Sequence, residues 1–174
     1  MNEQERINAL EVALANEMRE REFYLKNAQK TRNALGKIVF QLIGDEELEH
    51  YERLKELHQK WVQQEKWPET VPLKVKDTMV RDVLKDFLQK METSPEKDEN
   101  DLEAVQTAIE FEATGEMYYK NLQSQVTDIK EKQFFALLAS MEREHYLSLK
   151  DTEEYLTDSV SWFRKKEHHS LDGA

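Results

Sequence analysis

The chain repeats itself at an offset of 95 residues, and this repeat limits the possible folds more than any other feature. Between residues 42 and 55, seven of fourteen positions are identical 95 residues later. The wider repeat pairs Glu17 with Glu112, Tyr24 with Tyr119, Glu47 with Glu142, His50 with His145 and Tyr51 with Tyr146. In both halves the two paired Glu residues are 30 positions apart. Duplication of a whole helical hairpin explains this regularity, so we expect two copies of one structural unit.

Each half contains two long stretches with the apolar spacing of packed helices. Apolar residues recur at alternating steps of three and four, as in Ile7, Leu10 and Leu14, which is the spacing found in helical bundles. All three prolines fall between residues 68 and 95, so no proline interrupts a helix elsewhere. The pattern predicts helices over about 2–30, 33–65, 101–127 and 128–156.

The connections between these helices predict the fold class. The breaks near 31–33 and 126–128 are short, and short breaks join antiparallel helices into hairpins. The connection over about 66–100 is long enough to run the length of a bundle, and its apolar residues predict a short helix over 75–91. We therefore expect an all-α, ferritin-like four-helix bundle over 1–156, with a long crossover between its second and third helices. The tail, 157–174, is expected to pack on the bundle or to be partly flexible.

Composition and charge exclude several classes of protein. Charged residues make up 35% and apolar residues 39% of the 174, with 4 Gly and 3 Pro, which suits long amphipathic helices and argues against a turn-rich β fold. The net charge of −11 argues against a nucleic-acid or anionic membrane partner. The sequence shows neither a long apolar span nor the pattern of a signal peptide, so we expect a cytoplasmic location.

Six ionisable residues stand at helix positions that the repeat predicts to face the core. They are Glu17, Glu47, His50, Glu112, Glu142 and His145, each near the middle of its helix. A buried carboxylate costs several kcal/mol unless it is paired, protonated or bound to metal. A His three residues after a Glu shares its helix face, so each Glu and His pair can bind one metal ion. This set predicts a site for two metal ions, with a buried polar network that lacks metal as the alternative.

These motifs resemble those of the ferritin-like di-iron carboxylate proteins, and in particular the rubrerythrin branch. The resemblance covers about 1–60 and 100–156. It rests on a Tyr seven residues after Glu17 and after Glu112, and on the runs DEELEH at 45–50 and MEREH at 141–145. It implies that Glu47 and Glu142 bridge two metals, that Glu17, Glu112, His50 and His145 are terminal ligands, and that Tyr24 and Tyr119 donate hydrogen bonds to ligand carboxylates.

The chain departs from the rubrerythrin pattern in two respects. Rubrerythrins usually carry a rubredoxin-type iron centre held by cysteines, and this sequence contains no cysteine. The resemblance therefore implies that electrons come from a separate donor protein. Rubrerythrins also carry an extra carboxylate where this chain has Gly115. Glu116, at a position expected to face inward, and Glu20, at the equivalent place in the first helix, are the candidates for an extra ligand. An ion pair between Arg21 and Glu116 is the alternative.

The donor set and the resemblance together favour a di-iron oxidoreductase. Four Glu carboxylates balance two divalent ions, and mixed carboxylate and imidazole ligands without thiolate suit iron or manganese. We expect two iron ions, or manganese in their place, with hydrogen peroxide or O2 as the oxidant and a homodimer as the assembly. The alternatives are ferroxidase-type iron handling, a manganese catalase-like site, and an interaction protein that binds metal only for stability.

Overall fold

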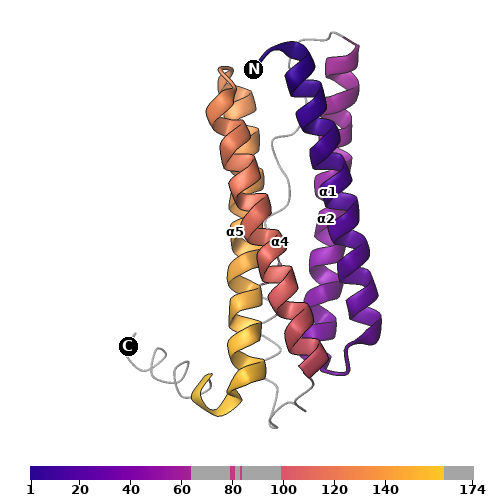
Figure 1. The fold of residues 1–174 in the computed structure, drawn as a ribbon, viewed down its shortest axis with the longest axis vertical. Coiled ribbons are helices and arrows are strands. Elements are labelled where there is room, and N and C mark those ends of the chain that lie inside the picture. The colour runs from indigo at the N-terminus through magenta and orange to yellow at the C-terminus, as the bar shows by residue number, and fades with distance from the viewer. Residues whose placement is uncertain (64–78, 81–82, 84–98, 163–174) are drawn as a thin grey trace.

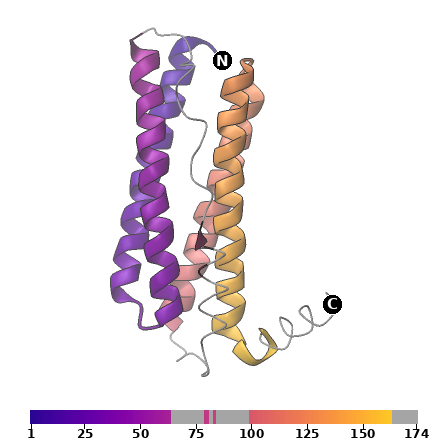
Figure 2. The same ribbon diagram turned by 180° about the vertical axis from the view of Figure 1, so that it is seen from behind.

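The described part of the chain forms four long helices. In this computed structural model, residues 1–63, 79–80, 83 and 99–162 are described. The helices are α1 (Glu3–Lys30), α2 (Ala34–Val62), α4 (Glu99–Gln125) and α5 (Ile129–Thr157). Helices α1 and α2 form one antiparallel hairpin, α4 and α5 form the other, and the hairpins pack lengthwise (Figures 1 and 2). The expected all-α four-helix bundle is confirmed, with helix bounds within three residues of those predicted.

Polar side chains fix where the helices begin. Asn2 and Glu5 form a capping box at the start of α1, each accepting a hydrogen bond from the other's backbone N–H. Asn33 and Asp128 cap α2 and α5, each accepting two backbone N–H bonds from the first turn. The backbone N–H of Asn33 also donates to Asp101 Oδ2 at 3.1 Å, which ties the turn of the first hairpin to the start of α4.

Two apolar clusters fill the bundle, one toward each end. The first lies where α1 ends and α2 begins, and its largest buried members include Tyr24, Leu35, Phe40, Ile43 and Tyr155. The second lies where α2 ends and α5 begins, and includes Leu10, Leu54, Leu57, Phe134 and Leu138. Burial of these side chains supplies the main favourable free energy of folding. The six polar residues lie between the clusters, so the core is apolar at both ends and ionisable in the middle.

The crossover and the tail are described only in part. The short helix expected over 75–91 lies mostly outside the described residues. Within it, Val80 is buried in the first apolar cluster, whereas Met79 is 60% exposed. In the tail, the Trp162 ring is buried edge-on against Tyr155 at 5.8 Å, while residues 163–174, with Phe163, lie outside the described residues. No described helix is both long and apolar enough to cross a membrane.

Candidate metal centre

The six polar residues converge at the middle of the bundle. Each helix contributes one Glu, α2 and α5 each add one His, and every one of these side chains is no more than 2% exposed. They form two overlapping groups in which one ligand atom per residue lies within 4.8 Å of the others. The first group contains Glu17, Glu47, His50 and Glu142, and the second contains Glu47, Glu112, Glu142 and His145. Because Glu47 and Glu142 belong to both groups, the geometry offers two neighbouring positions that share two carboxylates.

Both histidines face the centre through Nδ1. His50 Nδ1 lies 3.1 Å from Glu17 Oε2 and 3.1 Å from Glu47 Oε2. His145 Nδ1 lies 3.2 Å from Glu47 Oε1 and 3.4 Å from Glu112 Oε2. The two rings stack with their centroids 5.7 Å apart. His50 Nδ1 thus faces carboxylates from three helices, since Glu142 Oε1 also lies 3.4 Å away, and His145 Nδ1 faces carboxylates from two.

Two buried tyrosines hold the carboxylates of α1 and α4. The Tyr24 hydroxyl on α1 donates to Glu112 Oε1 on α4, and the Tyr119 hydroxyl on α4 donates to Glu17 Oε1 on α1. These are contacts of the kind that the rubrerythrin resemblance implies for both tyrosines. In each Glu the hydrogen bond engages one oxygen, and the other oxygen, Oε2, lies close to a histidine. The hydroxyls thus fix the orientation of both carboxylates.

The two histidines have different support on their outer side. His145 Nε2 lies 2.7 Å from Glu46 Oε2, a hydrogen bond to a carboxylate that leaves Nδ1 free to act as a ligand. Glu46 also accepts the backbone N–H of Met79 at 2.9 Å, which ties the crossover to the centre. His50 Nε2 is buried without a hydrogen-bond partner among the described residues. Sequence reasoning did not connect Glu46 with His145, because the two residues are 99 positions apart on different helices and Glu46 has no carboxylate counterpart at position 141 of the repeat.

The surroundings shift the pKa values of the carboxylates at the centre in different directions. Burial and then the charge of Glu47 raise the pKa of Glu17. Burial also raises the pKa of Glu112, against the opposing effect of His145. For Glu47 itself burial opposes ionisation, but His50 and His145 outweigh it and hold its pKa well below the usual range. Of these three carboxylates, the surroundings therefore favour the ionised form of Glu47 alone.

The pKa values of both histidines are raised, although burial by itself would lower them. Burial alone would lower both pKa values, because it disfavours the charged imidazolium. Glu47 beside His50 and Glu112 beside His145 outweigh that effect and raise both pKa values well above their usual range. In the absence of metal, these carboxylates therefore favour the protonated form of both rings.

Unsatisfied buried atoms show that this donor set fits metal ions. Both oxygens of Glu47, both oxygens of Glu142, Glu112 Oε2 and His145 Nδ1 are buried without a well-formed hydrogen bond among the described residues. Some lie within ion-pair distance of each other, but buried polar atoms left in this state are costly. A divalent ion in each group would engage these atoms, and carboxylate with imidazole is a ligand set suited to iron or manganese.

The two candidates for an extra ligand lie in different surroundings. Glu20 is 6% exposed, and burial, with the charges of the four acidic residues of the centre, raises its pKa to about 11. Glu116 instead pairs with Lys120 and, at 3.6 Å, with Arg143, and it belongs to neither ligand group. The Glu116 side chain is 13% exposed, and its ion pairs among the described residues are with Lys120 and Arg143 rather than with Arg21. Residues three and four positions apart lie on the same face of a helix. Here the residues three positions after Glu17 and Glu112, which are Glu20 and Gly115, face inward.

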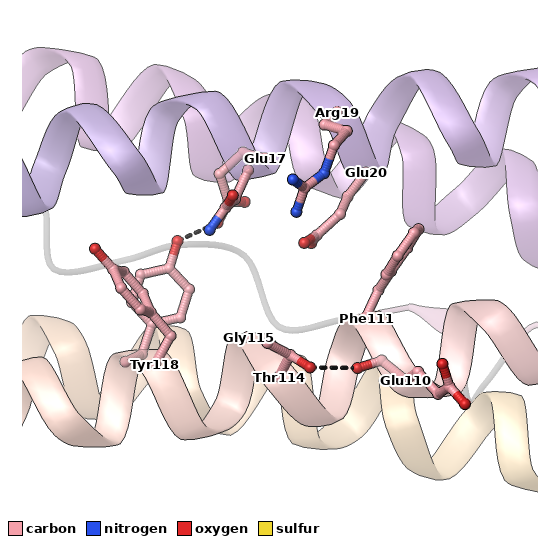
Figure 3. A pocket seen from close by; sticks show the side chains of 10 residues that line it. Glu17, Arg19, Glu20, Glu110, Phe111, Thr114, Gly115 and Tyr118 are labelled. Atoms are coloured by element: carbon pink, nitrogen blue, oxygen red, sulfur yellow. Dashed lines mark hydrogen bonds between the residues drawn. The ribbon is translucent and has the colours of Figure 1, made fainter.

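A cavity of about 300 Å³ lies between α1 and α4 and reaches the centre. Glu17, Glu20, Gly115 and Tyr119 line its inner part. Arg19, Glu110 and Phe111 are also among the lining residues, and Figure 3 shows the Glu20 side chain pointing from α1 across the cavity toward α4. A molecule as small as a peroxide or dioxygen has room to approach Glu17 by this route.

A four-helix bundle with two overlapping groups of buried Glu and His defines the class of ferritin-like carboxylate proteins. The rubrerythrin family model matches residues 8–102, which is more than half of the chain, and the chain therefore belongs to the rubrerythrin family. No curated protein and no solved structure matches it. The family match covers most of α1 and all of α2, and the repeat relates α4 and α5 to them. Family and buried cluster together support a site for two metal ions.

Proposed function

We propose that this chain is a di-iron carboxylate oxidoreductase that reduces hydrogen peroxide or O2 with electrons from a separate donor protein. The observation that carries the proposal is the pair of overlapping ligand groups that share Glu47 and Glu142. A pair of Fe(II) ions supplies two electrons at one place, which is what reduction of peroxide to water requires. Family membership supports the same chemistry.

The residues of the chain would position this chemistry. Glu47 and Glu142 would hold both ions, while Glu17 with His50 and Glu112 with His145 would each hold one. Tyr24 and Tyr119 keep the outer carboxylates in place, so little reorganisation is needed when charge changes at the centre. The apolar clusters on both sides limit access of water to the centre. The oxidant would enter by the cavity between α1 and α4.

The test begins with metal content and continues with turnover. Protein reconstituted with Fe(II) under anaerobic conditions should hold close to two ions per chain by elemental analysis. The loaded protein should then consume peroxide or O2 in the presence of an artificial reductant, while the double variant His50→Ala, His145→Ala should not. A reproducible content of one ion or fewer would contradict the dinuclear centre.

The same experiments separate the remaining candidates. Release of O2 from peroxide by manganese-loaded protein would indicate a catalase-like reaction. A cage-sized assembly on size exclusion would indicate iron storage, whereas our proposal predicts a homodimer. Full metal loading without consumption of any oxidant would indicate an interaction protein that uses metal only for stability.

A further inference from the structure

The cavity between α1 and α4 is larger than the reduction of hydrogen peroxide or O2 requires. Its volume is about 300 Å³. An apolar cavity of about 150 Å³ is already large enough to bind benzene. The outer end lies at the exposed residues Arg19, Glu110 and Thr114, and the inner end reaches the buried Glu17. The space between them can therefore hold an organic group together with a peroxide.

The two walls of this cavity come from equivalent positions of the repeat, but their chemistry differs. The wall on α1 includes Asn16 and Glu20, and the residues 95 positions later are Phe111 and Gly115 on α4, which line the cavity as well. The wall on α4 also includes Tyr118. Figure 3 shows the Phe111 ring projecting from α4 toward α1. One wall is therefore polar, and the other consists of two aromatic rings with a glycine between them.

Gly115 leaves room between the two aromatic rings. Phe111, Gly115 and Tyr118 follow one another at steps of four and three, so they share one face of α4. The two rings stand two turns apart, about 10.5 Å along the helix axis. A Cβ atom on Gly115 would lie 3.2 Å from Glu142 Oε2, so this part of the wall borders a carboxylate that belongs to both ligand groups. A group that lies between the rings is therefore next to the centre.

Contacts outside the cavity hold both aromatic rings in place. The Phe111 ring packs edge-on against the Phe23 ring, with their centroids 5.0 Å apart. The Tyr118 hydroxyl donates to the backbone carbonyl of Ala9 at 2.8 Å, so its polar group is already satisfied. A preformed cavity with aromatic walls and a few polar groups is typical of sites for small organic molecules. The aromatic wall therefore exists before any ligand binds.

We propose that this cavity binds the organic group of a hydroperoxide, R–O–O–H, in which R is uncharged and about the size of a phenyl ring or slightly larger. The inference rests on the proposed function and names a substrate class for it. The group R lies against Phe111 and Tyr118, and the peroxide group points inward past Gly115 toward Glu17. Reduction breaks the O–O bond, takes two electrons from the donor protein and two protons from solvent, and gives the alcohol R–OH and water.

Binding of the product alcohol tests the cavity without any turnover. Oxidised, iron-loaded protein is titrated in a calorimeter with 2-phenyl-2-propanol, the alcohol formed from cumene hydroperoxide. The wild type should bind it at a single site. Phe111→Ala removes one aromatic ring, and Asn16→Phe fills the cavity from the opposite wall. Each should weaken binding by about tenfold or more, because small changes of fit in an apolar pocket have effects of this size.

Tyr51→Ala is the matched control for Phe111→Ala. Tyr51 is a half-buried aromatic residue next to His50, as Phe111 is a half-buried aromatic residue next to Glu112, but Tyr51 does not line the cavity. This variant should bind the alcohol as the wild type does. Circular dichroism of every variant verifies the helical fold, and binding and turnover of the wild type decide the case where a variant does not fold.

Turnover with an artificial reductant links this binding to the reaction. The wild type should reduce both cumene hydroperoxide and hydrogen peroxide. The two cavity variants should lower kcat/KM for cumene hydroperoxide more than kcat/KM for hydrogen peroxide, mainly through a higher KM, because they remove contacts that only the organic group makes.

The outcomes separate this inference from the proposed function. A wild type that reduces hydrogen peroxide but neither binds the alcohol nor reduces cumene hydroperoxide would overturn the inference and leave the proposed function standing. Equal binding of the alcohol by the wild type and both cavity variants would do the same. A wild type that binds the alcohol but reduces neither peroxide would overturn the proposed function, and with it the assignment of hydroperoxides as substrates.

Discussion

Glu47 and Glu20 lie in the same buried centre, yet their surroundings move their pKa values in opposite directions. Both lose hydration, which alone would favour the protonated form. Glu47 lies beside His50 and His145, which keep it ionised. Glu20 is surrounded by other carboxylates, which raise its pKa further. Identical side chains therefore differ in charge because of the partners that the fold gives them.

The shared position of two carboxylates predicts how metal content depends on each residue. Glu47→Ala and Glu142→Ala should each lose both ions, because each removes a ligand common to the two groups. His50→Ala and His145→Ala should each weaken mainly one ion, because each histidine belongs to one group. Elemental analysis after iron reconstitution measures both effects. Full metal content in either Glu variant would contradict the shared role.

The close approach of the Glu142 carboxylate to Gly115 gives a second prediction for a single residue. In Gly115→Ala the new methyl group would press on Glu142 at 3.2 Å and displace its carboxylate, so metal affinity should fall. The apo protein should lose little stability, because alanine favours a helix over glycine by about 1 kcal/mol. Gly36→Ala is the control, since its methyl group would meet Thr31 Oγ1 at 3.3 Å, in the turn between α1 and α2. Equal metal affinity in the two variants would contradict the prediction.

At the scale of the elements, the turn between α1 and α2 holds the first hairpin in place against the second. The Asn33 side chain accepts two N–H bonds at the start of α2, and its own N–H donates to the buried Asp101 of α4. Both functions meet in a residue that is 7% exposed. The cap of α2 is therefore buried within the bundle, where water cannot replace a lost hydrogen bond.

Removal of that cap should destabilise the whole bundle. Asn33→Ala leaves two buried N–H groups at the start of α2 without their acceptor, so we expect a loss of about 1–2 kcal/mol in the free energy of unfolding. Asn2→Ala is the matched control, because it removes a cap at the exposed end of α1, where water can replace it. Urea unfolding of both variants measures the difference. A smaller effect for Asn33→Ala than for Asn2→Ala would contradict the role given to this turn.

At the scale of the whole molecule, the centre makes the stability of the apo protein depend on pH. The pKa values of Glu17, Glu20 and Glu112 are raised above their ordinary 4.5, so their contribution is fully present below pH 4.5 and is lost as pH rises toward their folded values. The raised pKa values of His50 and His145 act the same way above pH 6.5. Glu47, whose pKa is lowered, stays ionised from pH 5.5 to 8 and adds no change.

The apo protein should therefore be more stable at pH 5.5 than at pH 8. The reason is that these groups hold protons in the folded protein that the unfolded chain has lost at the higher pH. Bound metal should reduce the difference, because it fixes the carboxylates in their ionised form at both pH values. Urea midpoints of apo and loaded protein at the two pH values measure this. An apo midpoint that rises between pH 5.5 and 8 would show that the acidic residues do not form one coupled centre.

The sequence alone determined the bundle and the composition of its centre. Apolar spacing and the position of the prolines located the four helices, because helix periodicity is a local property of the chain. The 95-residue repeat brought out Glu17, Glu47, His50, Glu112, Glu142 and His145, and the structure brings all six together. The hydrogen bonds of Tyr24 and Tyr119 to carboxylates, which the family resemblance implies, are also present.

Only the tertiary structure decided which way the neighbours of these residues point. Glu20 and Arg21, three and four positions after Glu17, both lie on the same helix face as Glu17, so periodicity cannot tell which of them points into the core. The packing of α1 against α4 puts Glu20 and Gly115 inward and leaves Glu116 to pair with Lys120 and Arg143. The pairing of Glu46 with His145 also joins residues 99 positions apart. Such contacts arise from the orientation of whole helices, which no local pattern encodes.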